Sequence, residues 1–213
     1  MATEIRPASA ADGPAIARVR RESWFAAYAG IIDAQLIDRA TAPGGHGSSA
    51  APSYRTTLVA VAPEEQAVGG TAGAQPQAVI GYTAFGPERT VASAIPPNLS
   101  LSGGADEAAA PRPEAAGPPP GPLTEAGLAG ETGELYALYL TPAWWSAGIG
   151  RALTDAVLTA LRADSYRRVV LWTLTGNARA RRFYETAGFA PDGATNILTG
   201  LGGVEELRYV RDI

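Results

Sequence analysis

The sequence predicts one α/β domain built on a mixed β-sheet, and three observations lead to this prediction. Strand-like and helix-like segments alternate from residue 134 onward, and hairpin-like segments lie towards both ends of the chain. The length of 213 residues corresponds to one domain, or to one domain with a large insertion. A domain of this length buries roughly 70% of the surface of its unfolded chain, which is enough for a full core.

The N-terminal part predicts a short strand, a helix and two further strands. Residues 4–6 resemble a strand, and Ser9 and Asp12 are suitable caps for the helix that follows. Apolar side chains then recur at approximately helical spacing, at Ile16, Val19, Trp24 and Tyr28. Residues 41–53 are predicted to form a loop. Two strands are expected at 57–62 and 78–85, joined by an unusually long connection.

Residues 88–132 differ in composition from the rest of the chain. Six prolines lie among the twelve residues from Pro111 to Pro122, with Ala and Gly around them. Such a stretch cannot keep a helix or a sheet ladder and buries too little apolar surface to offset its ordering entropy. We predict that 88–132 is a disordered, low-complexity insertion within a single domain spanning residues 1–213.

The C-terminal part carries the clearest periodicities. A strand is expected at 134–140, followed by a helix whose apolar residues recur at i, i+3 and i+4 over 149–163. A second strand is expected at 168–174. Asn177 can cap the next helix, which Gly188 ends, and the tail resembles a closing hairpin.

Missing residue types exclude several kinds of chemistry. The chain has no Cys and no Lys, and its one His is His46 in a Gly- and Ser-rich stretch. A thiolate nucleophile, a P-loop and a Schiff-base lysine are therefore excluded, and we expect no metal site. The net charge of −4 and the lack of a long apolar run favour a cytoplasmic protein without nucleic-acid or membrane partners.

The segment 145–151, Trp-Ser-Ala-Gly-Ile-Gly-Arg, is the main candidate for a binding site. Its glycines allow backbone N–H groups to face a ligand, and the helix N-terminus adds a partial positive charge. Together they can hold a pyrophosphate without a lysine, although the same residues can also make a simple strand-to-helix turn. Leu153 stands where a dinucleotide-binding loop needs a third glycine, which argues against a nicotinamide cofactor.

Three motifs, one of which overlaps this loop, connect the sequence to a known family. Leu-Tyr-Leu-Thr-Pro lies at 138–142, Gly-Ile-Gly-Arg-Ala-Leu at 148–153, and an Asn…Phe-Tyr…Ala-Gly-Phe series at 177–189. Together they resemble the GNAT superfamily of acetyl-CoA-dependent N-acetyltransferases. The resemblance covers about 4–40, 57–62, 78–87 and 134–213. It implies a central, mostly antiparallel sheet flanked by helices, with acetyl-CoA as cosubstrate.

The chain departs from the family at the start of the loop. The family's loop usually opens with Arg or Gln followed by Gly, whereas this chain has Trp145 and Ser146. An indole cannot donate the paired hydrogen bonds of an arginine. Loop amides would still bind a pyrophosphate.

The resemblance implies a role for each motif. Leu138, Tyr139 and Leu140 would offer backbone groups to the pantetheine arm and polarise the thioester carbonyl. The pyrophosphate would be held by Ser146, Ala147, Gly148, Ile149, Gly150 and Arg151. Asn177 would bind the pantetheine arm, with a helix N-cap as its alternative role. Tyr184 would protonate the departing thiolate, with a core aromatic as the alternative.

The general base and the acceptor pocket are less defined. Glu134 is our candidate for the base, because strand alternation places it on the face of Tyr136, Leu138 and Leu140. The alternative is a solvated charge at the strand end. Some family members carry the base near the end of the following strand, where this chain has Trp172 and Thr173. The candidate walls of the acceptor pocket are Trp24, Phe25 and Tyr28, which could equally be core residues.

We therefore predict an N-acetyltransferase that moves the acetyl group from acetyl-CoA to a primary amine by direct transfer in a ternary complex. The acceptor, a small molecule or a peptide, is not identified by the sequence. The oligomeric state stays open, although dimers are common in the family. Two other functions are considered: a non-catalytic CoA-binding sensor on the same fold, and a scaffold that acts through the Pro-rich insertion.

Overall fold

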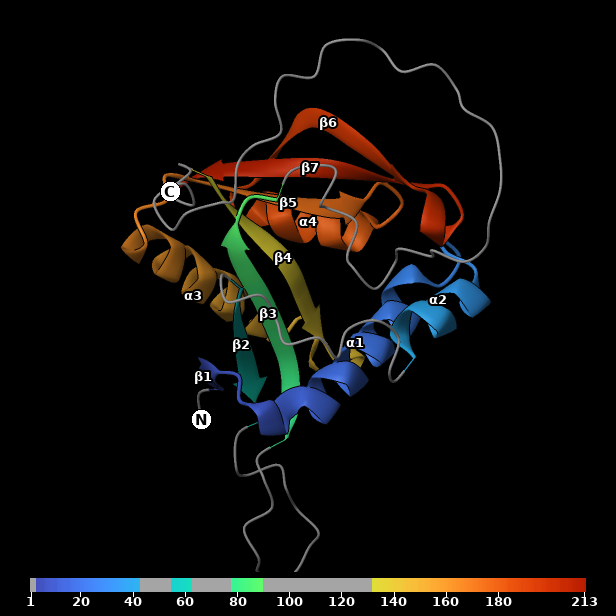
Figure 1. Ribbon diagram of the computed structural model, residues 1–213, viewed down its shortest axis with the longest axis horizontal. Coiled ribbons are helices and arrows are strands. Elements are labelled where there is room, and N and C mark those ends of the chain that lie inside the picture. The colour runs from blue at the N-terminus through green and yellow to red at the C-terminus, as the bar shows by residue number, and fades with distance from the viewer. Residues whose placement is uncertain (1–2, 43–54, 63–77, 90–131) are drawn as a thin grey trace, which may run out of the picture.

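The computed structural model describes residues 3–42, 55–62, 78–89 and 132–213 (Figure 1). Seven strands form one sheet in the order β1-β2-β3-β4-β5-β7-β6. The strands are β1 (Glu4–Pro7), β2 (Thr56–Val61), β3 (Val79–Pro87), β4 (Thr132–Leu140), β5 (Arg168–Leu174), β6 (Ala190–Leu198) and β7 (Val204–Asp212). The helices are α1 (Gly13–Tyr28), α2 (Ala34–Thr41), α3 (Ile149–Ala163) and α4 (Ala178–Thr186), with short 3-10 turns between some elements.

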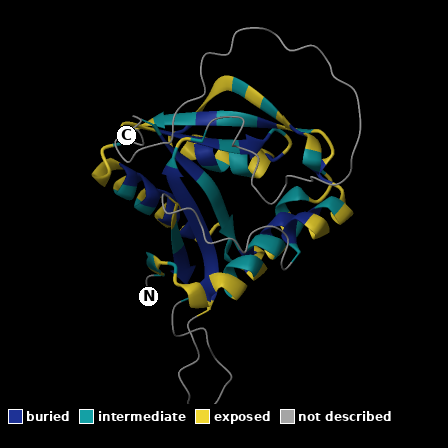
Figure 2. Ribbon diagram, viewed as in Figure 1, coloured by how far each residue is buried: buried dark blue, intermediate teal, exposed yellow. Residues whose placement is uncertain are grey.

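The sheet is mixed, as the sequence predicts. Every neighbouring pair of strands is antiparallel except β4 and β5, which run parallel. Helices α3 and α4 pack on one face of the sheet and α1 and α2 on the other, because the buried clusters join α3 and α4 to one set of strand residues and α1 and α2 to another. Figure 2 shows the central strands as the most buried part of the molecule.

The element boundaries follow the predicted ones closely. Helix α1 begins beside Asp12, whose carboxylate accepts hydrogen bonds from the Ser9 backbone and hydroxyl and from Arg6. The Arg6 guanidinium holds the pKa of Asp12 well below its usual range. The sequence analysis does not predict the second helix, α2. Asp33 caps it by accepting a bond of 2.8 Å from the Gln35 N–H.

A bulge in β4 overturns one prediction. Ala84 pairs with Ala137 but Phe85 pairs with Leu135, so Tyr136 is an extra residue in the strand. The extra residue reverses the alternation of side chains between the two faces. Leu135 and Leu138 pack with α3, whereas Glu134 lines a cavity together with Trp24 of α1. The prediction that Glu134 shares a face with Leu138 and Leu140 is therefore wrong.

The predicted insertion lies almost wholly outside the described residues. Only Glu88, Arg89 and Thr132 of the range 88–132 are described. Pro87 pairs with Gly133, and the N–H of Glu88 donates to the carbonyl of Thr132 over 3.1 Å, so the segment leaves and re-enters the sheet at one point. None of the helices in the described part is long and apolar enough to cross a membrane.

Candidate active site

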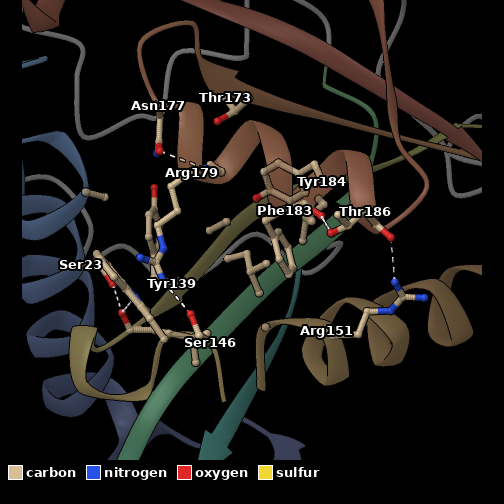
Figure 3. Close-up of a pocket in the computed structure, with 18 of the residues that line it drawn as sticks. Ser23, Tyr139, Ser146, Arg151, Thr173, Asn177, Arg179, Phe183, Tyr184 and Thr186 are labelled. Carbon is tan, nitrogen blue, oxygen red and sulfur yellow. Dashed lines mark hydrogen bonds between the residues drawn. The ribbon is translucent and has the colours of Figure 1, made fainter. Parts of the chain in front are cut away.

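A cleft opens where β4 and β5 separate. The two strands pair only as far as Leu135 and Leu171, and beyond these residues they diverge. The gap holds a cavity of about 460 Å³ whose walls include Ser23 of α1 and Tyr184 of α4 (Figure 3). Because α1 and α4 cover opposite faces of the sheet, the cavity is lined by residues from both faces.

The loop before α3 closes one end of this cavity. Ser146 and Gly148 have φ values of 64° and 82°, in the left-handed region that favours glycine. The first N–H groups of α3 have no partner within the helix, as at any helix N-terminus. Gly150 packs so closely that a Cβ would lie 3.3 Å from the Phe183 ring. The loop therefore combines free amides with a tight approach between α3 and α4.

The guanidinium of Arg151 is occupied by protein groups. It forms an ion pair with Asp155 at 3.1 Å and donates to the carbonyl of Thr186 at 3.2 Å (Figure 3). Its charge is therefore paired with a carboxylate, and its backbone N–H is one of the unpaired amides at the start of α3.

The edge of β4 that faces the cleft is partly used by the protein itself. The carbonyl of Leu140 accepts hydrogen bonds from the Ser23 hydroxyl and, at 2.9 Å, from the Trp145 indole N–H. Both lone pairs of that oxygen are then engaged. The predicted backbone contacts to a pantetheine arm are left to the N–H of Leu140 and to the backbone groups of Leu138. The backbone groups of Tyr139 point to β3, as those of Thr141 do.

Asn177 and Tyr184 line the opposite wall. The Asn177 side-chain oxygen accepts a bond of 3.1 Å from the Ala180 N–H, which is the N-cap role, and this bond leaves its amide nitrogen free to face the cavity. Tyr184 is 8% exposed and packs edge-on against Phe183 and Phe189. Burial raises the pKa of Tyr184, so its hydroxyl stays protonated at neutral pH.

A second, smaller cavity of about 90 Å³ adjoins the first. The two share wall residues from three elements, namely Tyr28, Leu135, Tyr136, Tyr139, Trp172 and Thr173. Trp24 and Tyr28 line it and meet edge to face at 5.2 Å between ring centroids. Phe25 lines neither cavity; Arg21 instead lies over its ring, with 4.9 Å from the guanidinium carbon to the centroid. The prediction of Phe25 as a pocket wall is wrong.

Two carboxylates with different surroundings line the smaller cavity. Glu134 is 1% exposed, and its oxygens accept bonds from the Arg89 backbone N–H at 2.8 Å and from the Arg89 guanidinium. Glu206 of β7 accepts one bond, 2.9 Å from the Asn196 amide to Oε1, and Oε2 has no hydrogen-bond partner among the described residues. Burial raises the pKa of Glu206.

Sequence reasoning missed Glu206, Arg89 and Arg179 as site residues. Side chains along β7 alternate between the two faces of the sheet, so Glu206 lies on the face opposite to Leu207 and Tyr209. Nothing in the sequence near Glu206 indicates that its face of the sheet is buried. Arg89 lies at the border of the Pro-rich insertion, far in sequence from the carboxylate that it binds. Arg179 follows Asn177 by two residues, so the motif itself was a signal for it.

A family model for the acetyltransferase (GNAT) family matches residues 48–189, about two thirds of the chain. The chain belongs to the GNAT acetyltransferase family.

Solved structures share the fold. The PaiA N-acetyltransferase of Thermoplasma acidophilum, determined in complex with coenzyme A, is 17% identical and covers 100% of both chains with a TM-score of 0.62. The ribosomal-protein-S18-alanine N-acetyltransferase of Escherichia coli is 12% identical, with a TM-score of 0.53 over 100% of this chain and 94% of that one.

The curated relatives match a short stretch. A mycothiol acetyltransferase from Beutenbergia cavernae is 50% identical over 60 residues. This stretch is 28% of the present chain and 20% of the relative, so the chain matches only about a fifth of that protein's length.

Proposed function

We propose that this protein transfers the acetyl group of acetyl-CoA directly to a primary amine within a ternary complex. The observation that carries the proposal is that two cavities adjoin each other between β4 and β5 and share six wall residues. The larger cavity has free amides at one end and Tyr184 on its wall, and the smaller one brings a buried carboxylate to the same gap. An acyl donor and an amine could meet there without a covalent enzyme intermediate.

The donor side fits the chemistry of acetyl-CoA. Free N–H groups at the start of α3 suit a pyrophosphate, and the gap beside β4 suits an extended pantetheine arm. Asn177 would donate its amide N–H to that arm, and an N–H of β4 would polarise the thioester carbonyl. A cavity of about 460 Å³ is in the range of known ligand sites.

The acceptor side needs a group that takes a proton from an alkylammonium. Glu134, the carboxylate that the sequence predicts for this step, is held by Arg89 through both of its oxygens. We therefore assign the proton-accepting role to Glu206, which has one oxygen without a partner among the described residues. Trp24 and Tyr28 would enclose the amine, since aromatic faces attract cations.

Tyr184 would complete the reaction on the other side of the thioester. As the amine attacks, the C–S bond breaks and the leaving sulfur gains negative charge. The protonated Tyr184 hydroxyl would donate to this sulfur. The chain has no cysteine, so it cannot carry the acetyl group on a thiol of its own.

Calorimetric titration with acetyl-CoA, followed by thiol release with a panel of small amines and peptide N-termini, tests the proposal. We expect binding on the order of micromolar and thiol release with at least one amine. Binding without release for any acceptor would favour a CoA-binding sensor. A folded protein that binds no acetyl-CoA would overturn the proposal.

A deletion separates the enzyme from a scaffold that acts through the insertion. Since the strand ends Pro87 and Gly133 are paired, residues 91–130 can be replaced by a short Asn-Gly turn. An enzyme would keep its acetyl-CoA affinity and turnover, whereas a scaffold would lose its function with that segment.

A further inference from the structure

The loop before α3 lacks a cation of its own in this chain. The family's loop usually opens with Arg or Gln, and here Trp145 occupies that position. Its indole N–H is bound to the Leu140 carbonyl, and the nearby Arg151 guanidinium is bound to Asp155 and the Thr186 carbonyl. Trp145 therefore carries no charge for a ligand that lies on the loop, and the charge of Arg151 is already paired with the carboxylate of Asp155.

Arg179 reaches this loop from α4, on the other side of the cleft. Its guanidinium carbon lies 4.3 Å from the centroid of the Trp145 ring, and its Nη2 donates to the Ser146 hydroxyl over 3.2 Å (Figure 3). These two contacts orient the guanidinium plane at the mouth of the larger cavity, which Arg179 also lines. Trp145 and Ser146, the two residues that depart from the family's loop, are the two that Arg179 contacts.

We propose that Arg179 supplies from α4 the cation that the loop lacks at position 145, and that it binds the pyrophosphate of CoA. This inference rests on the proposed use of acetyl-CoA. A guanidinium has five N–H donors, so the single bond to Ser146 leaves enough of them for two phosphate oxygens. Stacking on Trp145 reduces the freedom that the side chain would lose on binding.

A neighbouring cation extends the same surface. Ser146, Arg179, Arg182 and Phe183 line a hollow beside the mouth of the cavity. Two arginines at one rim of a chain with net charge −4 make this a local positive region. Arg182 thus adds a second positive charge beside Arg179, where it would attract the phosphates of CoA.

The test compares Arg179→Gln with the parent on three probes: CoA, 3′-dephospho-CoA and pantetheine, the last by competition against CoA. We expect about a tenfold loss of affinity for CoA, equivalent to about 1.4 kcal/mol, an equal loss for dephospho-CoA, and no change for pantetheine. Arg162→Gln, which removes a positive charge near the end of α3, is the matched control and should leave all three affinities unchanged.

Other results would overturn the inference. A loss for CoA that is absent for dephospho-CoA would assign Arg179 to the 3′-phosphate, and equal losses for all three probes would make it a structural residue. Unchanged affinities would show that the backbone N–H groups of the loop bind the pyrophosphate without Arg179. If the parent itself binds no CoA, the proposed function fails instead, which a titration of the parent separates from failure of the Arg179 assignment.

A second variant tests the positioning role of Trp145. Trp145→Phe keeps an aromatic face and Trp145→Leu removes it, and both lose the bond to the Leu140 carbonyl. If the aromatic ring positions Arg179, the Leu variant should bind CoA about threefold more weakly than the Phe variant, and both should bind pantetheine with equal affinity. Equal affinity of both variants for CoA would contradict a role for the stack.

Discussion

The two cavities that meet between β4 and β5 are built in different ways. The larger one is formed mainly by consecutive residues of two strand–helix connections and relies on backbone N–H groups at the start of α3. The smaller one draws side chains from α1, the end of β3, β4, β5 and β7, and relies on buried charges. Local sequence thus specifies the donor side, whereas the acceptor side exists only after the sheet has assembled.

The largest effect should come from placing a negative charge on the donor side. Gly148 has φ of 82° and open space where a Cβ would stand, and Asn and Asp both tolerate this conformation. We expect Gly148→Asp to bind acetyl-CoA roughly 1,000-fold more weakly than the isosteric Gly148→Asn, because a carboxylate would face the pyrophosphate. Titration calorimetry of both variants measures the difference. Equal affinities would mean that no anion lies at this loop.

The acceptor side should respond to the loss of one carboxylate. Glu206→Gln is expected to lower kcat/KM for the amine about 100-fold while the Kd for acetyl-CoA stays constant, because it removes the proton acceptor. Glu134→Gln instead weakens the ion pair with Arg89, and we expect a lower Tm for this variant. Thiol-release kinetics and thermal unfolding distinguish the two. A large kinetic effect confined to Glu134→Gln would restore Glu134 as the base.

A smaller effect is expected where the two sides meet. Tyr184→Phe removes only the hydroxyl and should lower kcat about 30-fold with an unchanged Kd for acetyl-CoA, since the ring keeps its packing. Tyr166→Phe, which removes a phenol at the edge of the core, serves as the control. A Tyr184→Phe variant with the kcat of the parent would reduce Tyr184 to a packing residue.

The smallest effect concerns stability and pH. Burial raises the pKa of Glu206 in the folded state, and Arg89, Glu134, Tyr28 and Tyr139 face the same pocket. A raised carboxyl pKa means that folding favours the protonated form, so its contribution is complete below pH 4.5 and is lost as pH rises through the folded-state pKa. The Glu206→Gln variant has no ionisable carboxyl group at this position, so it does not lose this stability as the pH rises.

We therefore expect Glu206→Gln to unfold at a higher temperature than the parent at pH 7.5, by about 2–4 °C for each kcal/mol of burial cost that the variant relieves in a protein of this size. The difference should vanish near pH 4. Thermal scans at both pH values measure it, and a variant that is less stable than the parent at pH 7.5 would contradict the assigned burial cost.

Much of the fold could be predicted because its signals are local. The stripe along α3 and the cap at Asn177 each involve residues within a few turns of one another. The bulge at Tyr136 could not be predicted, because it is defined by pairing with β3, some 50 residues away. One extra residue was enough to move Glu134 to the other face.

The sequence by itself determined the family of the protein and indicated the residues that we propose to hold acetyl-CoA. Glycines, caps and the Asn…Phe-Tyr series act through backbone conformation over short distances, so their consequences can be read without a structure. The tertiary structure alone decided which charges meet. It paired Glu134 with Arg89, left one oxygen of Glu206 without a partner among the described residues, and brought Arg179 onto Trp145. Such contacts depend on burial and on the register between distant segments, and neither is encoded in any single stretch of the chain.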